Sequence, residues 1–243
     1  IAALGAFGGA ALALIVVFGV AALGMMPNPN RDEAIHAYLV SHPAVLVDMS
    51  NAMQAQQEAS DDAKRQNAAD KLGTKAFFDP RVAFVTGPAD AKITMVEFFD
   101  YNCPYCRASV PAVRKFYAAH KNDARFAFIE FPIKGANSTI AARAAIAARN
   151  QPDKYLKFHF LLMNEEDVVT PDIIIADAKK AGLNVDKLKQ DMTDKSVAAA
   201  IAASRNLATA AKVDGTPAFI VNGHMREGAV DDAALNQLAQ QHV

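Results

Sequence analysis

The chain has 243 residues, 52% of them hydrophobic, and it carries 25 basic and 26 acidic side chains for a formal net charge of -1. This balance of charge excludes a strongly basic nucleic-acid-binding surface, and the length allows one sizeable domain with an appendage. The cysteine count is 2, too few for a structural disulfide framework, and the histidines are scattered without ligand spacing, so we predict no metal site and no cofactor.

The chain opens with an apolar segment, residues 1–26, that contains no charged or strongly polar side chain. This length is enough to span the hydrocarbon core of a bilayer and exceeds the usual apolar region of a signal peptide. We expect a membrane anchor, and the small residues Ala21, Ala22 and Gly24 leave a cleaved signal peptide as the alternative. Either alternative places the remaining residues in an oxidising compartment, the periplasm or cell envelope.

Residues 27–77 are predicted to form a helical stalk. A short helix over 32–40 precedes Pro43, which suits the first turn of a long second helix that extends to about residue 75. The apolar positions of the long helix keep a heptad-like spacing only at its start: Leu46, Met49 and Met53. A helix with so narrow an apolar stripe is not stable alone, so it packs on its own domain, pairs with other copies or frays.

Residues 78–243 show strands and helices in alternation. The first predicted elements are an edge strand over 81–86, a central strand over 93–99, a helix over 104–119 and a third strand over 125–131. Residues 137–211 are predicted to be helical, with breaks near 151–152, 170–171, 182 and 193. A hairpin over 218–221 and 224–227 turns at Asn222-Gly223, and a helix over 229–241 closes the chain. This order predicts an α/β fold that contains a helical insert.

The two cysteines, Cys103 and Cys106, lie between the predicted central strand and the helix that follows it. Two thiols separated by two residues at the first turn of a helix can close a small ring, and the helix N-terminus favours a thiolate on the first sulfur. The alternative is a chance pair of small buried residues on a helix. The strand before the motif and the amphipathic helix after it favour thiol–disulfide exchange.

Two segments carry a resemblance to a known family: Val96-Glu97-Phe98-Phe99-Asp100-Tyr101-Asn102-Cys103-Pro104-Tyr105-Cys106 and, far downstream, Gly215-Thr216-Pro217-Ala218-Phe219-Ile220-Val221-Asn222-Gly223. Together they resemble the DsbA-like branch of the thioredoxin superfamily over roughly residues 80–243. The resemblance implies a thioredoxin fold with an inserted helical domain. A helical extension before such a domain is similar to Com-one-type proteins and to the suppressor-of-copper-sensitivity (ScsC) family, which favours a homo-oligomer formed through residues 32–75. A solvated spacer is the alternative.

The resemblance also implies a role for each motif residue. Cys103 would be the exposed nucleophile that attacks a substrate disulfide, and Cys106 would be the resolving thiol. Pro217 would be a cis-proline facing the cysteines, and Thr216 would offer backbone groups to an extended substrate peptide. An ordinary proline at the start of a strand is the alternative for Pro217.

Three further residues complete the predicted site. Glu97 is an acid within an apolar strand, where family members carry a buried acid thought to move the proton of the resolving cysteine, a role that needs a raised pKa. The alternative is a carboxylate at the strand end, paired with a lysine or with solvent. Pro104 and Tyr105 lie between the cysteines and tune the thiolate. Because tyrosine cannot carry the charge of the histidine found in the most oxidising relatives, we expect a less depressed Cys103 pKa and a less oxidising disulfide.

The predicted function is a periplasmic protein disulfide isomerase or reductase that acts on unfolded or misoxidised proteins and is kept reduced by a DsbD-like membrane partner. One alternative is a DsbA-type dithiol oxidase that a DsbB-like partner recharges. Glutaredoxins share Cys-Pro-Tyr-Cys, but the length and the export signal argue against that family. An alternative of another class is a copper-binding or surface interaction module that uses the dithiol as a soft metal ligand.

Overall fold

The computed structural model describes residues 29–241, and the chain divides into two units between Glu58 and Ala59. The predicted anchor or signal peptide, residues 1–26, lies outside the described residues. Within residues 29–241, no helix has both the length and the apolar character needed to cross a membrane.

Two helices form the N-terminal part of the described chain, as the sequence predicts. They are α2 (Pro29–Ser41) and α3 (Ala44–Leu72). The long helix ends earlier than predicted, because Gly73 adopts a left-handed φ of 72° that favours glycine and starts the separate short helix α4 (Thr74–Phe77). Along residues 31–58 nearly every side chain is exposed, including the apolar ones.

Five strands form one mixed sheet: β1 (Phe84–Thr86), β2 (Ile93–Phe99), β3 (Ala124–Glu130), β4 (Ala218–Val221) and β5 (His224–Glu227). Their order is β1-β3-β2-β4-β5, and only the β2–β3 pair is parallel. The helix α5 (Pro104–His120) makes the crossover that a parallel pair requires. The predicted edge strand over 81–86 is shorter in the structure, because Val82 and Ala83 donate their backbone N–H groups to the Asp79 carbonyl in a turn.

Alternate side chains of the central strand β2 enter two separate cores, as the period of a strand requires. Met95 and Phe99 pack with α5, with α11 (Asp232–Gln240) and with the helical insert. Val96 and Phe98 pack on the opposite face with the end of α3, with α4 and with α10 (Lys195–Ala210). The alternation therefore assigns residue 97 to the face that α5 covers.

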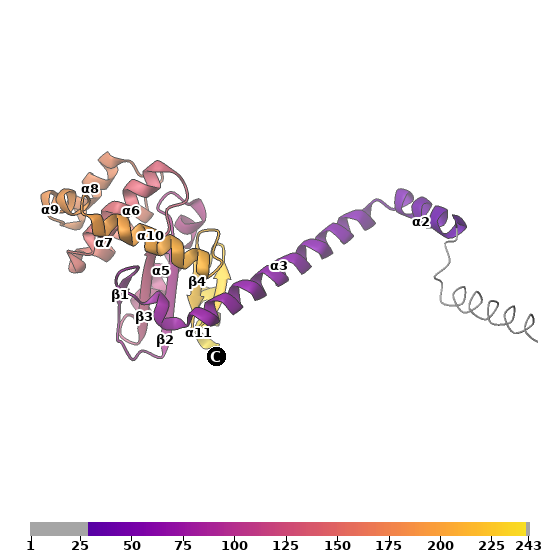
Figure 1. Cartoon of the computed structure of the whole chain (residues 1–243), viewed down its shortest axis with the longest axis horizontal. Coiled ribbons are helices and arrows are strands. Elements are labelled where there is room, and N and C mark those ends of the chain that lie inside the picture. Colours follow the sequence, from indigo (N-terminus) through magenta and orange to yellow (C-terminus); the bar gives the residue numbers. More distant parts are fainter. Residues whose placement is uncertain (1–28, 242–243) are drawn as a thin grey trace, which may run out of the picture. The chain divides into compact units, whose positions relative to one another are not determined.

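Between β3 and β4 the chain is helical, as predicted. Besides α10, the insert contains α6 (Ala136–Ala148), α7 (Pro152–Met163), α8 (Pro171–Ala181) and α9 (Val185–Asp191). Figure 1 shows α6 to α9 grouped at one end of the sheet. The predicted breaks are confirmed: Pro152 and Pro171 open their helices, and Gly182 ends α8 in a left-handed conformation with a φ of 83°.

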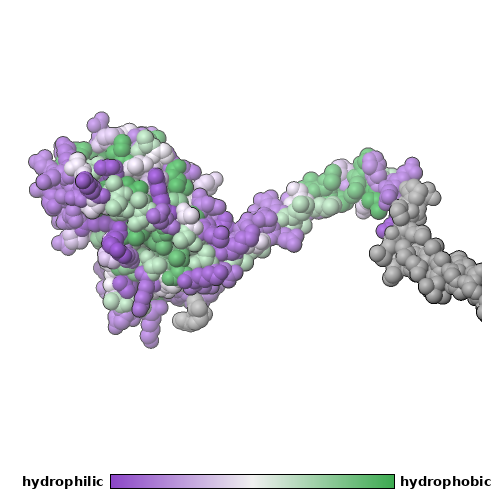
Figure 2. Space-filling view, in the orientation of Figure 1, coloured by the Kyte–Doolittle hydropathy of each residue, from purple (hydrophilic) through white to green (hydrophobic). Residues whose placement is uncertain are grey.

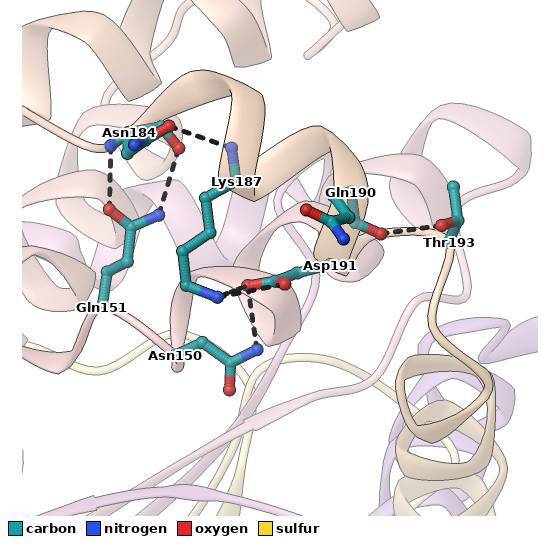
Figure 3. A network of polar contacts seen from close by, with 7 residues as sticks. All are labelled: Asn150, Gln151, Asn184, Lys187, Gln190, Asp191 and Thr193. Atoms are coloured by element: carbon teal, nitrogen blue, oxygen red, sulfur yellow. Dashed lines mark hydrogen bonds and ion pairs between the residues drawn. The ribbon is translucent and has the colours of Figure 1, made fainter.

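Side-chain hydrogen bonds fasten the short helix α9 to the α6–α7 connection (Figure 3). The Gln151 amide group accepts from the Asn184 backbone N–H at 2.8 Å and donates to the Asn184 carbonyl at 3.2 Å. Asn150 donates to Asp191 at 3.0 Å, and Lys187 pairs with the same carboxylate at 2.8 Å. These bonds compensate for the small apolar surface that a helix of this length can bury.

The last turns of α3 contact the β4–β5 hairpin within the second unit. The Gln66 side chain donates to the Gly223 carbonyl and accepts from the Met225 backbone N–H, both at 2.8 Å. Arg65 pairs with the Glu227 carboxylate at 3.1 Å. Because β5 is an edge strand with β4 on one side only, Gln66 satisfies backbone groups that would otherwise meet solvent or another chain.

We predict that Gln66→Ala lowers the free energy of unfolding by roughly 1 to 2 kcal/mol, because two hydrogen bonds to half-buried backbone groups are lost. Urea denaturation monitored by circular dichroism measures this difference. Gln56→Ala, at an exposed position of the same helix, is the matched control and is expected to change stability by less than about 0.5 kcal/mol. Equal effects of the two substitutions would contradict the role assigned to Gln66.

Candidate active site

The active-site loop joins the end of β2 to α5. Cys103 is the N-cap of α5, with extended backbone angles, and Pro104 occupies the first helical position, where its missing N–H costs no intrahelical bond. Cys106 lies in the first turn, and both cysteines are free thiols. The predicted strand, Cys-x-x-Cys motif and helix are therefore confirmed as local structure.

Thr216 and Pro217 meet the dithiol across the sheet. Because Phe98 pairs with Ala218, the end of β2 and the beginning of β4 lie at the same edge. The Thr216–Pro217 peptide bond is cis, and the Thr216 carbonyl accepts a hydrogen bond from Cys103 Sγ at 3.1 Å. The structure thus brings together the four residues that the resemblance assigns to the reacting centre.

One expectation is wrong for the state that the structure describes: the Cys103 side chain is buried rather than exposed. In the protonated form, the hydrogen bond that the Cys103 thiol donates to the Thr216 carbonyl holds the sulfur against the cis-proline loop, and ionisation of the thiol removes this donor. Pro104 and Tyr105, which follow it, are exposed. These two residues therefore form the exposed surface of the motif beside the buried sulfur.

The environment of Cys103 stabilises a thiolate. A hydrogen bond from the Cys106 thiol is the largest influence and, against the opposing effect of burial, it lowers the pKa of Cys103 from 9.0 to about 5. The Thr216 side chain and the backbone N–H groups of Tyr105 and Cys106 also lower this pKa. At neutral pH Cys103 is therefore a thiolate, the form that attacks a disulfide.

The pKa values of Cys106 and Glu97 are raised, whereas that of Cys103 is lowered. Burial raises the pKa of the Cys106 thiol far above its ordinary value, so Cys106 stays protonated until a base removes its proton. Glu97 lies on the face of β2 that α5 covers, is 3% exposed, and has a pKa raised from 4.5 to about 8 by burial. The alternative of a carboxylate paired at the strand end is excluded, because Glu97 lies in the middle of the strand and Oε2 has no hydrogen-bond partner among the described residues.

Tyr105 and Pro104 lie where the sequence places them, between the two cysteines. Tyr105 is 64% exposed, so its side chain faces the solvent, whereas both cysteines are buried. Thioredoxin has a nucleophilic cysteine with a pKa of about 7 and DsbA one of about 3.5, and the Cys103 value lies between them. The reduction potential expected for this chain stays a prediction.

Sequence reasoning missed two polar residues of the active-site loop, Asp100 and Asn102. The buried Asp100 carboxylate accepts from the backbone N–H groups of Asn102, Ile133 and Lys134 at 2.7, 2.7 and 2.8 Å. Asn102 donates to Ser138 Oγ at 3.1 Å. These bonds fix the loop against the segment that follows β3. An acid at the carboxyl end of a buried strand is the signal that could have identified Asp100.

A buried polar cluster that no sequence pattern indicates lies under this loop. His159 is buried, with 1% exposure, and its Nδ1 is 3.1 Å from Tyr101 Oη. Burial lowers the pKa of His159 to about 3, so the ring is neutral. Tyr155 donates to the buried Glu130 carboxylate at 2.8 Å, and Arg149 forms an ion pair with Glu130.

Comparison with known families assigns two parts of the chain. Residues 81–241 match the thioredoxin family, and residues 32–60 match the N-terminal domain of the copper resistance protein ScsC. The two matches fall on the segments that the sequence separates as a dithiol domain and a helical stalk.

Three solved structures with the same fold are between 28% and 38% identical to this chain. A thioredoxin-like oxidoreductase from Silicibacter pomeroyi is 38% identical, with a TM-score of 0.63, over 68% of this chain and 95% of that chain. A periplasmic thioredoxin-like protein from Salmonella enterica serovar Typhimurium is 32% identical, with a TM-score of 0.60, over 68% and 92%. BcfH from the same serovar is 28% identical, with a TM-score of 0.70, over 95% and 98%.

Curated relatives include longer proteins. The Na(+)/H(+) antiporter NhaA 3 from Salinispora tropica is 32% identical over 160 residues, which make up 65% of this chain. The chain spans only 24% of the length of that antiporter. The similarity therefore concerns one part of a larger protein.

We predict that the alkylation rate of Cys103 in the reduced protein falls with decreasing pH through a midpoint near pH 5. Iodoacetamide trapping followed by mass spectrometry measures this midpoint. Cys106→Ala should move it upward, because the Cys106 thiol is the donor that lowers the Cys103 pKa most. A wild-type midpoint above about pH 7, the thioredoxin value, would contradict the proposed stabilisation of the thiolate.

We also predict that Glu97→Gln stabilises the reduced protein increasingly as the pH rises from about 4.5 to about 8. In this range the folded wild type retains a proton that the unfolded chain releases, so its stability falls with rising pH. The variant does not lose stability in this way. Its free energy of unfolding, relative to that of the wild type, should therefore be higher at pH 9 than at pH 4 by a few kcal/mol, because one pKa unit corresponds to about 1.36 kcal/mol.

Urea unfolding of the reduced wild type and the variant at both pH values gives this difference. Glu58→Gln, at an exposed position, is the control that should show no such trend. A stability difference between Glu97→Gln and the wild type that stays constant with pH would show that Glu97 titrates normally.

Proposed function

The chain belongs to the thioredoxin family, and from this premise we propose that it is an envelope protein disulfide isomerase or reductase that acts through a mixed disulfide. The observation that supports this proposal best is the opposite tuning of two thiols in one helical turn. Cys103 has a pKa of about 5, whereas the pKa of Cys106 is raised by burial. One sulfur is thereby ready to attack, while the other stays protonated and does not compete with it.

The first step is attack of the Cys103 thiolate on a substrate disulfide. A bond forms between Cys103 Sγ and one substrate sulfur, the substrate disulfide breaks, and the second substrate sulfur leaves as a thiolate. A substrate thiolate that then attacks the mixed disulfide returns the Cys103 thiolate. The substrate disulfide has moved, and no net electrons are transferred, which is isomerisation.

If Cys106 attacks the mixed disulfide, the substrate is reduced instead of isomerised. The Cys106 thiolate attacks Cys103 Sγ, the Cys103–Cys106 disulfide forms, and the substrate leaves with two additional electrons as a thiolate, which takes up a proton. Glu97 lies under this helix with a pKa of about 8, so its ionised fraction can accept the Cys106 proton. A membrane reductase of the DsbD type would return the dithiol to its reduced form.

The competing oxidase differs in the resting state of the dithiol. A dithiol oxidase begins as the disulfide, accepts two electrons from a reduced substrate and is recharged by a DsbB-like partner. The uncharged Tyr105 and a Cys103 pKa above the DsbA value both favour the less oxidising enzyme. We therefore propose the isomerase or reductase, with the oxidase as the alternative.

The helical stalk is proposed to join copies of the chain through residues 32–75. Residues 32–60 match the ScsC N-terminal domain, and Figure 2 shows apolar side chains on α2 and the first part of α3. The large exposed apolar residues here are Ile35, Tyr38, Val40, Leu46, Val47, Met49 and Met53. Burial of such a set between copies would bring several dithiols to one substrate. A solvated spacer stays the alternative.

We propose the periplasm as the compartment of the dithiol domain. The similarity to a periplasmic protein of Salmonella enterica and the apolar residues 1–26, a signal peptide or anchor in this proposal, support the location. Unfolded or misoxidised proteins are the substrates expected there.

A second function, copper binding, is favoured by one observation. The family that residues 32–60 match is a copper resistance protein, and a reduced dithiol is a soft ligand pair suited to Cu(I). This alternative predicts tight Cu(I) binding by the dithiol together with no activity on disulfides.

We expect the full chain in its reduced form to restore activity to scrambled, disulfide-bonded ribonuclease. Recovery should require Cys103, so Cys103→Ser should remove at least about nine-tenths of the rate, because no other thiol is positioned to attack. Loss of recovery after deletion of residues 32–60 would further support an isomerase that requires several dithiols. Ready oxidation of reduced ribonuclease by the disulfide form, without recovery, would instead assign a dithiol oxidase.

A further inference from the structure

Large apolar side chains are exposed at three places in the described part of the second unit, residues 59–241. They are Tyr105 at 64%, Ile133 at 38% and Val168 at 54% exposure. They come from three separate segments: the first turn of α5, the loop after β3, and the loop between α7 and α8. A cleft of about 450 Å³ also opens beside Ile133.

Each of these segments is bonded to the loop that carries Cys103. The Ile133 backbone N–H donates to Asp100 at 2.7 Å. Val169, which follows Val168, donates its backbone N–H to Asn102 Oδ1 at 2.8 Å and is itself buried. The three exposed apolar side chains therefore border one region around the dithiol, and polar contacts of the active-site loop set their positions.

The α7–α8 loop depends on one further residue, Arg107, which directly follows Cys106. Its guanidinium donates to the Glu166 carbonyl at 2.9 Å and to the Asp167 carbonyl at 2.7 Å. It also donates to the Tyr101 carbonyl at 3.1 Å. Arg107 thus joins the loop that bears Val168 to Tyr101, two residues before Cys103.

The geometry requires an arginine. A guanidinium presents five donors in a rigid plane, so it can serve three carbonyls on two segments at once, whereas an ammonium group is a compact charge on a flexible stem. The groups that lower the Cys103 pKa most are Cys106, Thr216 and backbone N–H groups rather than Arg107. Its contacts hold structure in place rather than tune the sulfur.

We propose that Arg107 is a positioning residue for protein substrates. It holds the α7–α8 loop so that Val168, with Tyr105 and Ile133, contacts apolar side chains of an unfolded polypeptide whose disulfide meets Cys103. The proposal rests on the function proposed above. A small disulfide reaches Cys103 without touching this border, so Arg107 affects the recognition of proteins and not the reactivity of the thiolate.

The test compares a protein substrate with a small one on the full chain. For Arg107→Lys we expect KM for scrambled ribonuclease to rise roughly five- to tenfold, the size expected when one aliphatic contact is lost. We expect kcat, the rate of reaction with glutathione disulfide and the pH profile of Cys103 alkylation to stay within about twofold. Arg114→Lys is the matched control on the same helix, where Arg114 lies 5.5 Å from the Phe160 ring centroid, and it should leave KM unchanged.

A second variant keeps the proposal testable if Arg107→Lys folds poorly. Val168→Ser changes only an exposed side chain, and it should raise KM for the ribonuclease by a similar factor without affecting the glutathione reaction. An unchanged KM in both variants, or equal losses with the protein and the small substrate, overturns the proposal. If the wild type does not reactivate scrambled ribonuclease, the proposed function and this proposal both fail. If the wild type is active, the two variants test this proposal alone.

Discussion

The antiparallel pairing of β2 with β4 is the constraint on which the candidate site depends. Phe98 pairs with Ala218, so the chain leaves β2 towards Cys103 at the edge where it enters β4 from Pro217. The two halves of the site are 113 residues apart in sequence, and only this register brings Cys103 Sγ to the Thr216 carbonyl. A one-residue slip would turn Glu97 away from α5 and place Val96 on that face instead.

The difference between the two thiols follows from their positions on one helix. Cys103 is the N-cap, where unpaired backbone N–H groups and a neighbouring thiol point at its sulfur. Cys106 is one turn further along and faces the buried side of the sheet, where burial and the neighbouring Cys103 sulfur disfavour a second negative charge. The same pair of residues therefore gives one thiolate and one thiol without any external cation.

The sequence was sufficient for features that depend on local pattern. The strand, the motif and the helix around Cys103 follow from hydrophobic periodicity, and Pro152, Pro171 and Gly182 mark helix ends. The end of α3 at Leu72 is harder to predict, because helix formers lie on both sides of Gly73 and a single glycine does not always end a helix. The pair of Glu130 with Arg149 and the burial of His159 were not predictable, because each depends on partners from elements far apart in sequence.

Polar contacts explain how a helical insert can be placed accurately beside a reactive thiol. Apolar packing alone tolerates small sliding of helices, because it has no preferred direction. A hydrogen bond, in contrast, is directional and weakens steeply when its donor and acceptor move out of line or apart. Asn102 and Arg107 bond backbone groups at the α7–α8 loop, and Asp100 bonds those after β3. The insert is therefore fixed to the loop that carries the dithiol, where a shift of one ångström would matter for a bound substrate.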